Sequence, residues 1–183
     1  PARSPAKAGG KSPKKTPGIH SAGAKGGLSA PPENCIFFSM RFGPDHNVEP
    51  MAVELQTALQ PKGVQAKIIN MMGGGDIDRA VFSGIEECDT FVVFGSAKYG
   101  QDTGNPASTF NEAKFAQTNG KRIILIRMIP FDEDFEFPQA RFMFGLNKLE
   151  IPWMMGEPMP PDLADVIFEA MGLSGDSSAG GKV

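Results

Sequence analysis

The chain of 183 residues is poor in the side chains that most often bind metal ions or cross-link small domains. It has two cysteines, Cys35 and Cys88, and two histidines, and they form no zinc-binding pattern. Cys35 begins an apolar run and Cys88 falls on the apolar stripe of a predicted helix, so we interpret them as separate core thiols in a reducing compartment. The sequence therefore predicts neither a metal centre nor a disulfide framework.

Long apolar runs and nucleoside-triphosphate motifs are also missing. No run reaches the roughly 18 apolar residues of a membrane-spanning helix, and the first residues contain no apolar stretch of the signal-peptide type. The G-x-x-x-x-G-K-[ST] pattern of P-loop enzymes does not occur. We therefore expect a cytoplasmic protein that has no membrane span and is not a P-loop nucleoside triphosphatase.

Charge divides the chain into a basic leader and an acidic body. Six of the 18 basic residues and none of the 21 acidic residues lie within 1–32, which leaves 12 basic against 21 acidic residues, a net charge of −9, for 33–183. The leader is mostly Pro, Gly, Ala, Ser and Lys, which predicts disorder. Its KSPKK stretch resembles nucleic-acid-binding tails, but we interpret the leader as a solvated linker and 174–183 as a flexible tail.

Between these ends, apolar runs of strand type alternate with segments of helical periodicity. Strands are expected at 35–42, 64–69, 90–95 and 122–128, with a short fifth strand within 148–155. Helices are expected within 47–63, 76–88, 108–120 and 161–173, with Asp76 as the N-cap of the second. This alternation predicts a parallel sheet covered by helices on both faces, with ligands bound beyond the carboxyl ends of the strands.

Three loops converge at that edge, one after each of the first three strands. Arg41, in the first, is either an exposed strand-end residue or a bidentate partner for a phosphate. The glycines of NMMGGGD (70–76), in the second, favour a flexible turn over a phosphate cradle. Ser96 and Tyr99, in the third, offer hydroxyl groups and a ring that could stack on a ligand.

Glu112, near the start of the third helix, has two interpretations. Thr109 and Glu112 have the spacing of a capping box, in which Thr is the N-cap and Glu occupies position N3. Alternatively, an ionised carboxylate at the mouth of the sheet stabilises a cation that develops during a reaction. The spacing is compatible with both.

Over residues 35–173 the order and spacing of these motifs resemble a TIR (Toll/interleukin-1 receptor/resistance) domain. CIFFSMRF (35–42) resembles the first strand of the family, with Met40 where Tyr is common. Residues 68–99 resemble the second strand, the glycine-containing BB loop, the following helix and a third strand that ends in Ser. Residues 110–128 resemble the helix that carries the family's Glu and the fourth strand. The resemblance implies a flavodoxin-like parallel sheet of four or five strands, with a TIR-like α/β domain over 33–173.

The resemblance also implies an activity. Active TIR domains cleave NAD+ at the nicotinamide glycosidic bond in stress or immune signalling, and some cyclise the product. Their catalytic Glu lies on the third helix, where Glu112 falls. The positions taken to bind substrate are Ser39, Arg41, Phe42, Gly75, Ser96, Tyr99 and Phe110. NAD+ would be the substrate, and no cofactor or metal is implied.

Two other functions remain open at this point. TIR domains without activity serve as signalling adaptors that assemble through TIR–TIR contacts, and the BB loop (70–76) implies a homo-oligomer on activation. A nucleoside-modifying transferase of similar sheet topology would also place a Glu near a ribose. Neither alternative changes the expected fold.

Overall fold

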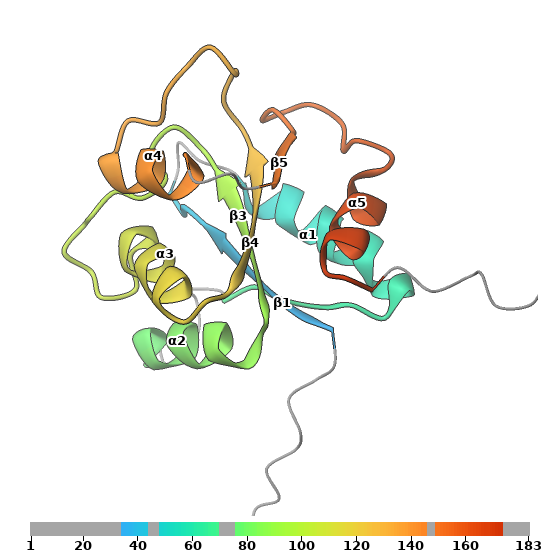
Figure 1. Ribbon diagram of the computed structural model, residues 1–183, viewed down its shortest axis with the longest axis horizontal. Coiled ribbons are helices and arrows are strands. Elements are labelled where there is room, and N and C mark those ends of the chain that lie inside the picture. Colours follow the sequence, from blue (N-terminus) through green and yellow to red (C-terminus); the bar gives the residue numbers. More distant parts are fainter. Residues whose placement is uncertain (1–33, 44–47, 70–75, 146–148, 174–183) are drawn as a thin grey trace, which may run out of the picture.

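A computed structural model of the protein describes residues 34–43, 48–69, 76–145 and 149–173 (Figure 1). These residues form one five-stranded parallel sheet with the strand order β2-β1-β3-β4-β5. Its strands are β1 (Cys35–Met40), β2 (Gln65–Lys67), β3 (Thr90–Gly95), β4 (Arg122–Arg127) and β5 (Leu149–Pro152). The predicted flavodoxin-like α/β fold is confirmed. The leader 1–32, the tail 174–183 and Gly75 lie outside the described residues.

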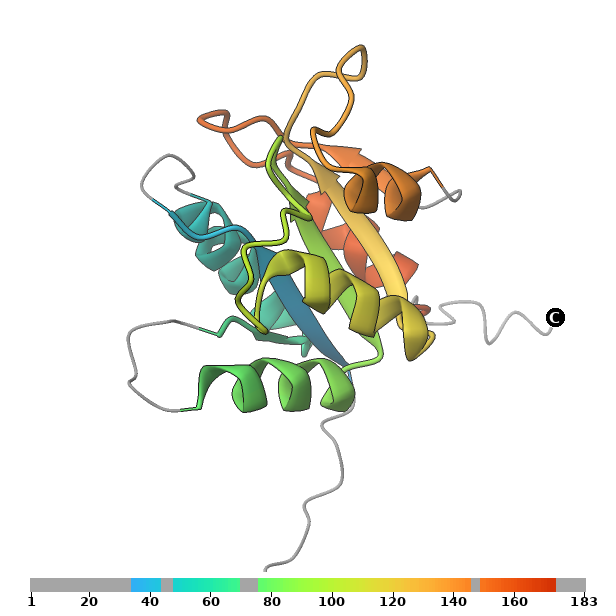
Figure 2. The ribbon, with the colours of Figure 1, turned by 90° about the vertical axis from the view of Figure 1, so that its left-hand side faces the viewer.

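Helices cover both faces of the sheet (Figures 1 and 2). One face carries α1 (Glu49–Leu59), which continues as the short 3-10 helix η1 (Gln60–Lys62), and α5 (Leu163–Ala170). The other face carries α2 (Ile77–Glu87), α3 (Thr109–Thr118) and α4 (Pro138–Phe144). Two apolar layers result, one on each side of the sheet. Among the described residues, no helix is both long and apolar enough to cross a membrane.

The central strands form because their side chains are apolar on both faces. All six residues of β1 and all six of β3 are buried, the pattern expected of strands with helices above and below. The strands at the edge are shorter than predicted: β2 has only three residues, with Gln65 exposed. The Gln56 side chain of α1 donates a hydrogen bond to the Ala66 carbonyl of β2, which fixes this edge strand against the helix.

The order of the strands defines where the sheet changes direction. From β1 the chain crosses to β2 on one side, and β3 then pairs with β1 on the other side. The switch point therefore lies between the carboxyl ends of β1 and β3, the position at which open α/β sheets bind ligands. Residues 41–43 after β1, the loop after β3 and the start of α3 form this edge.

The two cysteines differ from the expectation. Cys35, the first residue of β1, and Cys88, which follows α2, form a disulfide with their Cα atoms 4.8 Å apart. The prediction of separate thiols is wrong. The two residues are 53 positions apart in the sequence, but the fold places them in the same apolar layer beneath α2. The inference of a reducing compartment rested on separate thiols and loses that support.

Candidate active site

Glu112 lies at the switch point, on the inward side of α3. The helix begins at Thr109 with Ser108 as its N-cap, so Glu112 is the fourth helical residue and not the third. Its backbone N–H donates to the Ser108 carbonyl, as in any helix interior, and its side chain is only 7% exposed. The capping-box interpretation is therefore wrong, because the carboxylate points to the sheet and not to the helix end.

Two hydroxyl groups hold the Glu112 carboxylate. Ser39 of β1 donates a hydrogen bond from Oγ to Glu112 Oε2 over 2.5 Å. The hydroxyl of Tyr99, in the loop after β3, lies 2.7 Å from the same Ser39 Oγ. Both partners are buried, Ser39 to 1% and Tyr99 to 0% exposure. Strand β1, the loop after β3 and helix α3 thus each contribute one member of a buried polar cluster.

Burial controls the charge of this cluster. Removal from water raises the pKa of Glu112 from 4.5 to about 7, although the hydrogen bond from Ser39 stabilises the ionised form and works in the opposite direction. Burial, followed by the nearby Glu112 charge, raises the pKa of Tyr99 well above its usual value. At neutral pH, Tyr99 is therefore a neutral hydroxyl and Glu112 is divided between its acid and its carboxylate.

The raised pKa predicts that Glu112→Gln stabilises the protein above neutral pH. The folded state binds the proton more tightly than the unfolded state, so this contribution to stability is complete below pH 4.5 and is lost as the pH rises through about 7. This rise in the pKa of Glu112 corresponds to roughly 3 kcal/mol in the free energy of unfolding. Gln keeps an oxygen for the Ser39 hydrogen bond but does not ionise.

Urea unfolding at about pH 8 and about pH 5 measures this effect. The Gln variant should be more stable than the wild type at the higher pH, and the difference should shrink at the lower pH. Equal stability at both values would show that burial does not raise the pKa of Glu112.

The carboxylate lines one cavity, and a second cavity adjoins the first. A small one of about 20 Å³ is lined by Glu112 and by apolar side chains, namely Phe37, Phe38, Met40, Phe42, Ile69, Ile77, Val81 and Ala107. A larger one of about 200 Å³ is lined by Arg41, Phe42, Thr103, Asn105, Ala107, Ser108 and Thr109. Phe42 and Ala107 border both. The smaller cavity holds little more than one water molecule, so a ligand reaches Glu112 only when rim side chains such as Phe42 move.

Two arginines lie at the carboxyl ends of strands β1 and β4, and they differ in their partners. Arg127, the last residue of β4, donates to the carbonyls of Ile129, Pro130 and Glu133 and to the carboxylate of Glu150. Arg41, just beyond β1, has a buried Nε without a hydrogen-bond partner among the described residues. Because a buried guanidinium nitrogen requires an acceptor, Arg41 is the group here that is suited to bind an anion.

The structure brings together most of the residues predicted for the site. Ser39, Tyr99 and Glu112 are in contact, and Arg41 and Phe42 line the adjoining cavities. Tyr99 differs from the expectation because its ring is fully buried and packs 5.7 Å from the ring of Phe144. It therefore has no free face on which a ligand could stack.

The remaining predicted residues are less closely tied to the cavities. Ser96 is buried at the end of β3, and its Oγ has no partner in the described part of the chain. Phe110 is half-buried on α3 and lines neither cavity. Sequence reasoning missed Ile69, Ile77 and Ala107, whose only signal is that they flank the loops at this edge.

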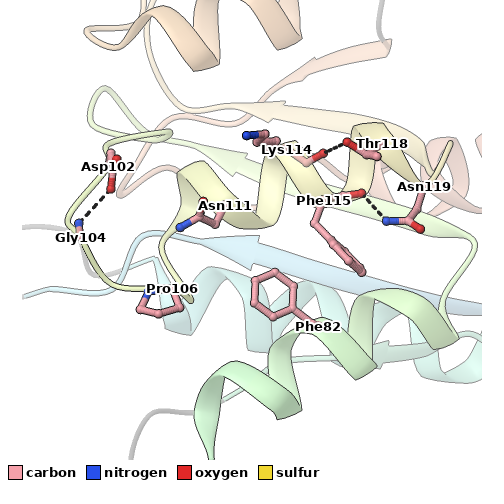
Figure 3. A pocket seen from close by; sticks show the side chains of 9 residues that line it. All are labelled: Phe82, Asp102, Gly104, Pro106, Asn111, Lys114, Phe115, Thr118 and Asn119. Atoms are coloured by element: carbon pink, nitrogen blue, oxygen red, sulfur yellow. Dashed lines mark hydrogen bonds between the residues drawn. The ribbon is translucent and has the colours of Figure 1, made fainter.

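A cavity of about 700 Å³, larger than the two at Glu112, lies between α2, α3 and the loop that precedes α3 (Figure 3). The rings of Phe82 and Phe115 meet edge to face in it, with centroids 5.0 Å apart. Asp102, Gly104 and Pro106 line this groove, whereas Thr103, Asn105 and Ala107 face the Arg41 cavity. Glu112 does not line the groove. We therefore place the site at Glu112, where a buried carboxylate meets hydroxyl groups beside the cavity that Arg41 lines.

No group of three or more His, Cys, Asp or Glu side chains in the described ranges is placed to hold a metal ion. The polar groups here are the Glu112 carboxylate with the hydroxyls of Ser39 and Tyr99, and Arg41 in the adjoining cavity. These groups suit a polar organic ligand that carries hydroxyl and anionic groups.

Comparisons with known proteins give no match in sequence and only weak similarities in structure. No family model and no curated protein match the sequence. Among solved structures, the CMP N-glycosidase BcmB of Clostridium botulinum is 18% identical, with a TM-score of 0.45 over 76% of this chain and 98% of that one. The TIR domain of the Toll-related receptor TRR-2 of Hydra magnipapillata is 14% identical, with a TM-score of 0.43 over 63% of this chain and 82% of that one. These similarities are too low to assign chemistry.

Proposed function

We propose that this protein hydrolyses the bond between nicotinamide and ribose in NAD+, with Glu112 as the catalytic carboxylate. The observation that carries the proposal is the position of Glu112. It is buried at the switch point of the sheet, it is held on one oxygen by Ser39, and it lines a cavity that adjoins Arg41. The TIR-like order of motifs in the sequence supports the same substrate.

A single carboxylate is sufficient for this reaction. Glycosidases commonly use a pair, because one acid must protonate a poor leaving group. Nicotinamide leaves NAD+ as a neutral molecule, since the bond to C1′ breaks with its electrons moving to a positively charged ring nitrogen. Glu112 is the only buried carboxylate among the described residues. The products are nicotinamide, ADP-ribose and one proton.

Glu112 would act in its ionised form. A negative charge beside the ribose stabilises the oxocarbenium-like cation that forms as nicotinamide leaves, and burial strengthens that interaction. The carboxylate also accepts a hydrogen bond from a ribose hydroxyl and activates the attacking water. Because the pKa of Glu112 is about 7, activity should rise with pH through neutrality.

The direct experiment measures nicotinamide release from NAD+ over a range of protein concentrations. Nucleoside 5′-monophosphates serve as a second set of substrates, with release of the free base as the readout. Release of the base from these monophosphates but not from NAD+ would show that the substrate is a nucleoside monophosphate and not NAD+. Absence of release from both, at concentrations where the protein is assembled, would favour a non-catalytic adaptor that acts through TIR–TIR contacts.

Arg41 is expected to bind the diphosphate of the substrate. Arg41→Ala should raise KM for NAD+ by roughly tenfold or more, the loss typical of a hydrogen bond to a charged group, with a smaller change in kcat. Arg122→Ala is the matched control, because Arg122 is exposed at the amino end of β4, the opposite end of the sheet. An unchanged KM in folded Arg41→Ala would remove Arg41 from the binding site.

A further inference from the structure

We infer that Tyr99 is a positioning residue for Glu112: acting through Ser39, its hydroxyl fixes which carboxylate oxygen is occupied within the protein and leaves the other oxygen for the substrate. The inference rests on the proposed function only where it assigns a substrate to the free oxygen. The arrangement of the three side chains is a property of the fold, and it can be tested without any activity.

The direction of each hydrogen bond follows from counting protons. Ser39 has one hydroxyl proton, and that proton is donated to Glu112 Oε2. When Glu112 is ionised, the contact of 2.7 Å between Ser39 Oγ and the Tyr99 hydroxyl must then be donated by Tyr99. The chain of donors therefore runs from Tyr99 to Ser39 to Glu112. Without Tyr99, the Ser39 hydroxyl could rotate to another acceptor, and the carboxylate would lose its fixed partner.

Tyr99 itself is held rigidly and does not face the ligand cavities. Its ring is fully buried and packs against Phe144, which in turn packs against Phe135 at 4.8 Å. Its backbone N–H donates to the Ser96 carbonyl in the turn after β3. The next residue, Gly100, donates its N–H to Thr109 Oγ1 at the start of α3. The loop that carries Tyr99 is thus fastened to the helix that carries Glu112.

The consequence for Glu112 is an asymmetric carboxylate. Oε2 is occupied by Ser39, whereas Oε1 has no hydrogen-bond partner among the described residues. Because Glu112 lines the small cavity, Oε1 is the oxygen available to a ribose hydroxyl or to the attacking water. A carboxylate that was free to rotate would present either oxygen, and only part of its population would be oriented for reaction.

Among the described residues, few other charged groups lie near this carboxylate. Helix α2 faces the cavity with Ile77 and Val81, and β1 contributes Phe38 and Met40, none of which ionises. Arg41 lies in the adjoining cavity, and Lys114, on α3 itself, is exposed. In the described part of the chain, Tyr99 is the ionisable group linked to Glu112 through Ser39, and it remains neutral at physiological pH because burial raises its pKa.

The test is a titration of Glu112 in Tyr99→Phe, which keeps the ring and removes only the hydroxyl. The protein is labelled with ¹³C at the Glu side-chain carboxyl, and the Glu112 signal is the one that disappears in Glu112→Gln. In Tyr99→Phe the Ser39 bond to the carboxylate weakens, so the ionised form is less stable and the pKa of Glu112 should rise further. Ser39→Ala, which removes the donor itself, should raise the pKa more.

Thr90→Val is the matched control, because it removes a buried hydroxyl at the opposite end of β3 and nearly preserves side-chain shape. The control should titrate as the wild type does. If Tyr99→Phe is not folded, Ser39→Ala carries the test, since it breaks the same chain of donors. An unchanged titration of Glu112 in a folded variant of either kind overturns the inference.

The kinetic readout separates this inference from the proposed function. If the protein cleaves NAD+, Tyr99→Phe should lose roughly threefold in rate at pH 7, the effect of one hydrogen bond of ordinary strength, and should recover at alkaline pH. If Tyr99→Phe loses the same fraction of its rate at all pH values, and the pKa of Glu112 is unchanged, Tyr99 is a packing residue only. A shifted titration in a protein that releases no nicotinamide would reject the proposed function and leave the positioning role of Tyr99 supported.

Discussion

Glu112→Gln should lower nicotinamide release from NAD+ by two or more orders of magnitude while the protein remains folded. The expected loss follows from the charge, because removing one electrostatic stabiliser of a transition state typically costs about 100-fold to 1,000-fold in kcat. The Gln side chain has nearly the same shape, and its oxygen can accept the hydrogen bond that Ser39 donates to Oε2. The substitution therefore removes the negative charge and leaves the hydrogen-bond chain in place.

The control for this substitution is Glu86→Gln. Glu86 is exposed on α2 and makes no contact with either cavity at the switch point. Circular dichroism and thermal unfolding should show both variants folded, with Glu112→Gln at least as stable as the wild type above neutral pH. Near-normal turnover by a folded Glu112→Gln protein would mean that this carboxylate takes no part in the chemistry.

The central part of the fold could be predicted because strands that are buried on both faces must be continuously apolar. Both β1 and β3 meet that condition over six residues. The edges were less predictable, since β2 is held partly by the Gln56 side chain, a contact that strand propensity does not report. Helix α4 was missed because it is only seven residues long and leaves Phe142 63% exposed, which obscures its apolar stripe of Ala140, Met143 and Phe144.

The site was predicted in position more accurately than in detail. Parallel strands bring their carboxyl ends to one edge, so the placement of Ser39, Arg41 and Glu112 near one another followed from the order of the elements. The capping-box spacing was misleading because the helix begins one residue earlier than that pattern requires, with Ser108 and not Thr109 as its N-cap. The role of Tyr99 depends on which side of a loop faces the core, and the periodicity of neighbouring strands does not determine that side.

Removing the Cys35–Cys88 disulfide should lower the free energy of unfolding by about 4 kcal/mol without reducing activity in the folded state. The cross-link joins positions 53 apart, and closing a loop of that length in the unfolded chain has an entropic cost of about this size. The closed loop contains α1, β2 and α2, so the cross-link restricts a large part of the unfolded domain. Urea unfolding of the Cys35→Ala/Cys88→Ala double variant, compared with the wild type in the absence of reductant, measures the difference.

The location of the disulfide separates its effect on stability from any effect on chemistry. Cys35 is at the amino end of β1, whereas Ser39 and Arg41 are at its carboxyl end beside Glu112. Both sulfur-bearing residues are almost fully buried, at 4% and 1% exposure, so a reductant reaches them mainly through unfolding. The double variant should therefore show wild-type turnover at low temperature and a clearly lower melting temperature. Two free thiols in the unreduced wild-type protein, titrated after denaturation, would contradict the cross-link. Reduced turnover of the double variant at a temperature where it is still folded would show that the two ends of β1 are coupled.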